Sequence, residues 1–232
     1  MLPSSTVENY LKAIFIGESQ LPPGQRLVPM GQLAAALTVA PGTATTMVKA
    51  LSESGLVEYE PYNGVRLTSA GSRLAALVLR RHRLIELFLV QMMGMRWDEV
   101  HDEAEQLEHV VSDRLIERID EMLGRPQVDP HGDPIPSREG ELVRRELDTL
   151  LTCPLNTSVT VMRVTDQDAA FLRFIEGNSL KPGQSIQVEA RDEVADSVRL
   201  KLPDDQSMTI GMRAASKLLV DVTKDSYLNG SS

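Results

Sequence analysis

The sequence predicts a mainly α-helical chain that ends in a small β-barrel. Two observations support this prediction. Apolar residues recur at helical spacing as far as about Leu151, and from Ser158 onward short alternating stretches replace them. One hairpin signal, Asn63-Gly64, interrupts the helical part. The chain has 232 residues, of which 42% are apolar and 25% charged, which is the composition of an ordinary globular protein.

The sequence lacks the features of secreted and membrane proteins. No apolar run approaches the roughly 18 residues that a membrane span needs. The first residues lack a basic stretch followed by an apolar one, as a secretory signal requires. The single cysteine, Cys153, excludes an internal disulfide framework and a cysteine zinc cluster. We therefore expect a cytoplasmic protein with no membrane partner.

The first five elements have the order of a winged helix-turn-helix. Pro41 suits the first turn of a helix, where its missing N–H costs nothing, and Gly55 is a natural helix end. A three-proline loop separates the first two helices. The predicted elements are helices over 5–18, 30–37 and 41–54 and strands over 56–60 and 65–68.

In a winged helix the helix from Pro41 would enter the major groove of DNA, and the hairpin would reach the backbone or the minor groove. Hydroxyls and free N–H groups at a helix start hold phosphate, and threonine also contacts bases. A helix-turn-helix used only for packing is the alternative. Residues 1–83 carry 8 basic and 5 acidic side chains, a balance of +3 within a chain of net charge −9, and this favours DNA. The candidate DNA-binding residues are Pro41, Gly42, Thr43, Thr45, Thr46, Lys49, Asn63 and Arg66.

The remaining elements are long helices followed by short strands. Helices are predicted over 69–91, 97–123 and 138–151, with a proline-rich extended loop over 124–137. Cys153-Pro154 marks a boundary. Beyond it we expect a helix over 168–176 among short strands at 159–164, 186–188, 197–202, 208–210 and 218–220, and a loose tail after Thr223.

Histidine and glutamate form two stripes on the long helices. His82 and Glu86 are four residues apart and share a face. A second stripe consists of His101, Glu105, Glu108 and His109. Carboxylates and imidazoles without thiolates suit Mn(II) or Fe(II), and Zn(II) is possible; exposed helix pairs are the alternative. Signatures of zinc proteases, di-iron bundles and nucleophilic hydrolases are absent from the sequence, so we expect no enzyme.

The motifs together resemble the diphtheria toxin repressor family of metal-dependent transcriptional regulators of iron and manganese homeostasis. The resemblance rests on the winged helix, on His82-x-x-x-Glu86, on Val100-His101-Asp102-Glu103-Ala104 with Glu108-His109, and on the segment from Asp129 to Pro136. It implies a DNA-binding domain over 1–73, a metal-binding and dimerisation domain over 74–151, an SH3-like (FeoA-like) domain over 152–224 and a flexible tail over 225–232.

The resemblance also implies two adjacent metal sites. The regulatory site would use Asn9, Glu105, Glu108 and His109, and the second site would use His82, Glu86 and His101. Some members add ligands from the SH3-like domain, where Asp166, Gln167 and Asp168 are the nearest candidates.

Two positions depart from the family pattern. Iron-sensing members have Cys where Glu105 stands, and because hard oxygen donors favour manganese, Mn(II) is expected in preference to Fe(II). Asn9 stands where Met or Asp is common. Lys12 replaces a carboxylate of some manganese sensors.

The implied function is a metal-activated repressor that binds a palindromic promoter site in double-stranded DNA as a homodimer. Residues 84–151 carry 7 basic and 17 acidic side chains, a balance of −10, which suits a region that needs metal. Two other functions stay open: a metalloenzyme built on the His/Glu stripes, and a metal-independent winged-helix regulator or adaptor.

Overall fold

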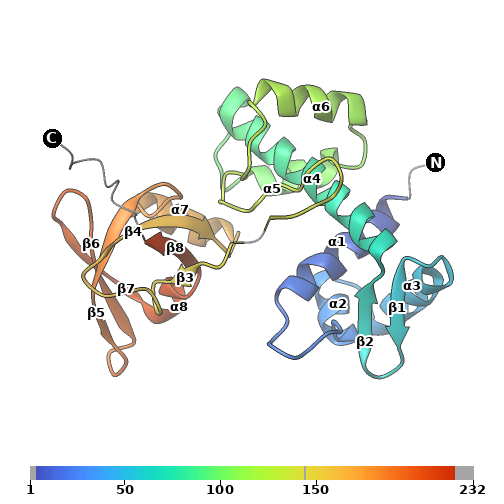
Figure 1. Ribbon diagram of the computed structural model, residues 1–232, viewed down its shortest axis with the longest axis horizontal. Helices are drawn as coiled ribbons and strands as arrows, with labels where there is room; N and C mark the ends of the chain where they lie inside the picture. The colour runs from blue at the N-terminus through green and yellow to red at the C-terminus, as the bar shows by residue number, and fades with distance from the viewer. Residues whose placement is uncertain (1–3, 144, 223–232) are drawn as a thin grey trace, which may run out of the picture. The chain divides into compact units, whose positions relative to one another are not determined.

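The computed structural model describes residues 4–143 and 145–222 (Figure 1). The chain forms two compact units. The first holds Met1–Phe88, Glu103–Gln127 and Ile135–Val143, and the second holds Leu89–Asp102, Val128–Pro134 and Arg144–Ser232. No helix among the described residues is long and apolar enough to span a membrane. The predicted tail, 225–232, lies outside the described residues.

The first unit begins with the predicted winged helix. It comprises α1 (Ser5–Ser19), α2 (Met30–Ala36), α3 (Pro41–Glu53), β1 (Val57–Glu60) and β2 (Gly64–Leu67). Ser4 caps α1, because its side chain accepts a hydrogen bond from the Val7 N–H. The two strands pair antiparallel, with Val57 opposite Leu67 and Glu60 opposite Gly64. Leu11, Ile14 and Val48 belong to the buried core that holds the helices and the hairpin together.

Three helices follow, and one of them differs from the prediction. α4 runs over Ser69–Met93, α5 over Val100–Leu107 and α6 over Asp113–Met122. The prediction of one helix over 97–123 is therefore wrong, because the chain turns between α5 and α6. Ser112 starts α6 as a new helix, since its hydroxyl accepts a hydrogen bond from the Leu115 N–H. The turn holds Glu108 and His109 just beyond the end of α5.

The segment after α6 forms a non-helical loop over 124–137, as predicted, although it folds back on itself at the bridge between Val128 and Pro134. The predicted helix over 138–151 is wrong. The described residues 138–143 and 145–147 form no helix, and β3 covers Asp148–Thr149. The Ser137 hydroxyl accepts hydrogen bonds from the N–H groups of Glu139 and Glu141, and this local bonding competes with a helix. Gly140 has φ +82°, which a helix does not allow.

The second unit contains the C-terminal antiparallel sheet. Its strands are β4 (Ser158–Val164), β5 (Ser185–Asp192), β6 (Ser197–Lys201), β7 (Ser207–Gly211) and β8 (Leu218–Val222). The described pairings give the order β3-β8-β4-β5-β6-β7, with α7 (Ala169–Gly177) and the short α8 (Met212–Ala215). The sequence missed β3 and α8. Val161, Leu172 and Leu200 lie in the buried core of this unit; closure of the sheet into a barrel stays a prediction.

Candidate metal centre

Two charged residues of α1 lie among the buried apolar residues of this helix. Glu8 and Lys12 are four residues apart, so they share a face of the helix. Both are buried, with only 3% and 7% of their surface exposed. Buried charges need partners to offset the loss of hydration, and both residues find them on α4 and around the end of α5.

The Glu108 carboxylate contacts residues of two other elements, α1 and α4, and is the middle of the candidate metal centre. Its side chain is fully buried. One oxygen, Oε1, accepts a hydrogen bond from Lys12 Nζ at 2.7 Å, and the other, Oε2, lies 2.6 Å from His82 Nδ1. Lys12 Nζ also donates to Glu105 Oε1 at 2.5 Å. Elements far apart in the sequence thus meet at one carboxylate. His82, Glu105 and Glu108 each offer a ligand atom, and these atoms lie within 4.8 Å of one another.

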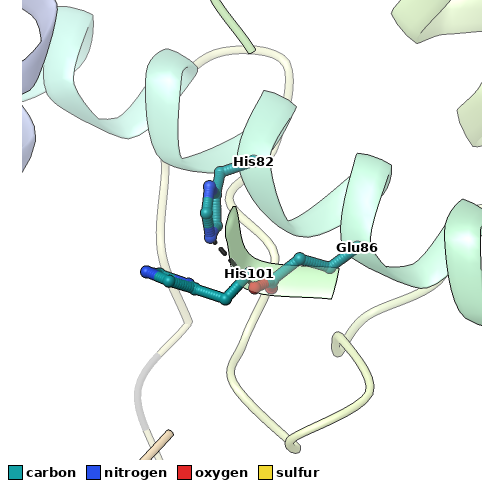
Figure 2. A group of neighbouring side chains, drawn as sticks. All are labelled: His82, Glu86 and His101. Carbon is teal, nitrogen blue, oxygen red and sulfur yellow. Dashed lines mark hydrogen bonds and ion pairs between the residues drawn. The ribbon is translucent and has the colours of Figure 1, made fainter. Parts of the chain in front are cut away.

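His82 lies between two carboxylates. Its Nδ1 faces Glu108, and its Nε2 lies 3.0 Å from Glu86 Oε1, as the dashed line in Figure 2 shows. Burial by itself lowers the pKa of His82, but the hydrogen bonds to Glu108 and Glu86 outweigh burial and raise this pKa to about 9. Without metal, both ring nitrogens therefore carry protons at neutral pH. A metal ion bound at His82 would have to replace one of them.

The same contacts act on Glu108. Burial raises the pKa of this carboxyl group, but the hydrogen bond from His82 and the charge of Lys12 outweigh burial and lower it. Glu108 is consequently ionised at neutral pH. It is held as a charged group by cations that a divalent ion could replace.

His109 is oriented by a residue that the sequence did not single out. Its Nδ1 lies 2.6 Å from Glu8 Oε2, and because a carboxylate only accepts, this nitrogen carries the proton. Its Nε2 lies 3.3 Å from Glu108 Oε1 without a hydrogen bond, so it turns an available nitrogen toward the centre. Arg81 holds Glu8 through two contacts of 3.3 Å and donates to the Glu108 carbonyl oxygen at 3.1 Å. Such outer partners fix the ring orientation of a metal ligand.

The donor set fits a divalent ion. The side-chain carbonyl oxygen of Asn9, Oδ1, is buried and accepts no hydrogen bond among the described residues. An unsatisfied buried oxygen beside Glu8 in the chain is costly unless something binds it. Carboxylates, imidazole nitrogen and an amide oxygen are the ligands that Mn(II) and Fe(II) accept.

The other predicted ligands lie in the second unit. Figure 2 draws His101, which belongs to the start of α5, and its role as a ligand stays a prediction of the family resemblance. Asp168 caps α7 by accepting a hydrogen bond from the Phe171 N–H, and Asp166 pairs with Lys217. These two aspartates thus have structural contacts of their own.

Two more residues of the second unit carry metal-binding groups. Asp129 and His131 are buried. From the sequence, their segment supported the family resemblance but was not predicted to bind metal. Asp129 Oδ1 accepts a hydrogen bond from the His131 N–H at 2.8 Å, and His131 Nε2 lies 3.0 Å from the Trp97 carbonyl oxygen. The Asp-x-His spacing of Asp129 and His131 was the one feature of the sequence that could have pointed to metal binding here, and by itself it is weak.

The candidate DNA-binding residues occupy α3 and the hairpin. Pro41, Gly42, Thr43, Thr46 and Lys49 are exposed and Thr45 partly so. The hydroxyls of Thr45 and Thr46 donate to carbonyl oxygens one turn earlier.

In the hairpin, Arg66 pairs with Glu58 and Asn63 with Glu60. Tyr62, which the sequence analysis did not name, lies at the tip with φ +68° and is fully exposed.

Family models of known proteins match three successive parts of the chain. The N-terminal DNA-binding domain of iron-dependent repressors matches residues 3–65, their metal-binding and dimerisation domain matches 68–137, and the FeoA domain matches 149–222. The iron-dependent repressor IdeR of Mycobacterium leprae is 26% identical over 229 residues, which is 93% of this chain and 96% of that protein. The diphtheria toxin repressor of Corynebacterium glutamicum is 35% identical over 132 residues, 56% of each chain.

Solved structures are similar over nearly their whole length. A manganese-dependent transcriptional repressor in complex with manganese is 39% identical, with a TM-score of 0.85, and the match covers 93% of this chain and 99% of that one. ScaR with bound Zn²⁺ is 31% identical, with a TM-score of 0.75, over 95% of this chain and all of that one. The chain therefore belongs to the diphtheria toxin repressor family of metal-dependent transcriptional repressors.

Proposed function

We propose that this repressor binds a palindromic operator as a homodimer when Mn(II) occupies the centre around Glu108. The observation that carries the proposal is the meeting of three elements at this carboxylate: Lys12 of α1, His82 of α4, and the turn after α5 that holds Glu108 itself. α1 packs within the winged helix, beside α2 and β2. An ion bound by Asn9 of α1 together with Glu108 would therefore link the metal centre to the DNA-binding elements.

The chain's own residues have distinct tasks. Asn9, Glu105, Glu108 and His109 would hold the regulatory ion, and His82, Glu86 and His101 the second. A bound divalent ion supplies the positive charge that offsets the clustered carboxylates and joins ligands of different elements. Glu8 and Arg81 hold the ring of His109 with its free nitrogen toward Glu108. Asp166 and Asp168 would add ligands only if they gave up their present contacts.

The choice of Mn(II) over Fe(II) rests on the donors. Glu105 and Glu108 are hard oxygen ligands, the described residues around them include no thiolate, and Asn9 adds a neutral oxygen. The similarity to a manganese-dependent repressor supports the same preference. Metal acts here as an effector that shifts the protein toward a DNA-binding state, because it binds that state better.

The proposal assigns residues 1–73 to DNA binding, 74–151 to metal binding and dimerisation, and 152–224 to the SH3-like domain. In a homodimer two copies of α3 would enter successive major grooves, which lie roughly 34 Å apart. Pro41, Gly42, Thr43, Thr45, Thr46 and Lys49 would contact DNA from α3, and Asn63 and Arg66 from the hairpin.

A mobility-shift assay with a palindromic promoter fragment tests the proposal. The wild-type protein should bind with Mn(II), bind more weakly with Fe(II) under anaerobic conditions, and lose binding with a chelator. Glu108→Gln should not respond to Mn(II). Glu121→Gln, an exposed glutamate paired with Arg118, is the matched control and should behave as the wild type. Equal binding of the wild type with and without metal would contradict the proposal.

A further inference from the structure

Lys12 holds the two carboxylates that the metal centre needs. Its ammonium donates to Glu105 Oε1 at 2.5 Å and to Glu108 Oε1 at 2.7 Å. The Lys12 side chain is only 9% exposed and the Glu108 side chain is fully buried, so little water competes for the contact between them. The methylene stem runs from a buried stretch of α1 that also contains Leu11 and Ile14. The ammonium is therefore tethered to the first helix and aimed at the carboxylate pair.

The Lys12 ammonium and a divalent ion would compete for the same carboxylate oxygens of Glu105 and Glu108. Each carboxylate carries one negative charge, and two carboxylates facing one place repel each other unless a cation lies between them. Lys12 offsets one of these two charges. The positive charge of Lys12 also repels an incoming divalent ion, by Coulomb's law.

We infer that the Lys12 ammonium competes with the metal ion for Glu105 and Glu108 and thereby sets the metal affinity of the centre. In the metal-free protein it holds Glu105 and Glu108 together, and a divalent ion binds through these oxygens only when they release the ammonium. Lys12 thus raises the metal concentration at which the repressor responds. This inference deepens the proposed function and rests on it, because it assigns regulation to the same site.

Calorimetric titration of the metal-free full chain with Mn(II) tests the inference. Lys12→Met keeps the apolar stem and removes the charge, so the variant should bind Mn(II) at least about fivefold more tightly than the wild type. That lower limit corresponds to the interaction of two unit charges about 4 Å apart in water, and the second charge of Mn(II) makes the expected effect larger. Lys12→Arg keeps the charge and should not bind more tightly than the wild type. Lys201→Gln removes an exposed lysine that pairs with Asp205 and should leave the affinity unchanged.

Thermal unfolding gives a second, independent readout. Without metal, Lys12→Met should melt at a lower temperature than the wild type, because Glu105 and Glu108 lose their shared counterion. Mn(II) should then raise its melting temperature by more than that of the wild type. If Lys12→Met does not fold without metal, Lys12→Gln replaces it with a neutral hydrogen-bond donor in both measurements.

The outcomes separate the inference from the proposed function. Unchanged Mn(II) affinity in Lys12→Met and Lys12→Gln overturns the role of Lys12, as does an Arg variant that binds as tightly as the Met variant. If the wild type still needs metal to bind its operator, the proposed function survives that result. A wild-type protein that binds DNA without metal overturns the proposed function itself.

Discussion

Glu8 orients His109, and replacing Glu8 by glutamine should weaken metal binding without removing a ligand. Glu8 is 3% exposed and accepts from His109 Nδ1 at 2.6 Å and from Arg81 at 3.3 Å. Glutamine has nearly the same shape but only one accepting oxygen. Its amide N–H₂ would face either His109 or Arg81, both of which are donors. One of the two contacts must therefore break.

The expected loss of metal affinity follows from the role of Glu8 as a hydrogen-bond partner of a metal ligand. Changes to residues that orient a metal ligand reduce metal affinity about 10–100-fold, or roughly 1.4–2.7 kcal/mol. Removing one partner of a buried ion pair costs about 3–5 kcal/mol of folding stability. Since Arg81 keeps its contact of 3.1 Å with the Glu108 carbonyl oxygen, we expect the lower end, about 3 kcal/mol.

Calorimetric titration with Mn(II) and urea unfolding measure the two effects. Because Glu8 orients a ligand and is not a ligand itself, every proposed ligand remains in Glu8→Gln, and saturating Mn(II) should restore its operator binding. Glu121→Gln, which removes an exposed charge from α6, is the control for the loss of one carboxylate. A Glu8→Gln protein with wild-type Mn(II) affinity would refute the orienting role of Glu8.

Three further predictions concern other parts of the chain. Gly132→Ala should destabilise the protein by about 1–3 kcal/mol in urea unfolding, because a Cβ there would lie 1.9 Å from the Met162 carbonyl oxygen; unchanged stability would contradict the close approach. Burial raises the pKa of Asp98, but hydrogen bonds from Arg96 and Arg173 outweigh it and hold the pKa below 3.8. The stabilisation by Asp98 should therefore be complete well above pH 3.8 and be lost as the pH falls through the lower folded-state value; Asp98→Asn should lack this pH dependence in unfolding measurements. Tyr62→Ala should weaken operator binding by about 1 kcal/mol, the net value of one hydrogen bond, in mobility shifts, while its Mn(II) titration stays as in the wild type.

Local signals in the sequence predicted most of the elements. Helical spacing of apolar residues, Pro41 at a helix start and Asn63-Gly64 in a turn act over a few residues, so the winged helix could be predicted without any tertiary contact. The two wrong helices failed for the opposite reason. The cap of α6 at Ser112 and the positive φ of Gly140 overrode a helical apolar pattern that continued through them.

The sequence by itself carried the family resemblance, which the comparisons confirm, and it predicted the residue types of the candidate metal centre. The spacing of His82 and Glu86 places both on one face of α4, whereas Glu108 and His109 lie in the turn after α5 and not on a face of that helix. Only the tertiary structure decided which groups share a carboxylate. Lys12 and Glu8 stand more than 90 residues from their partners Glu108 and His109, and no periodicity links positions that far apart. Burial then gives these contacts their strength, since charges removed from water must be paired with one another or with a metal ion.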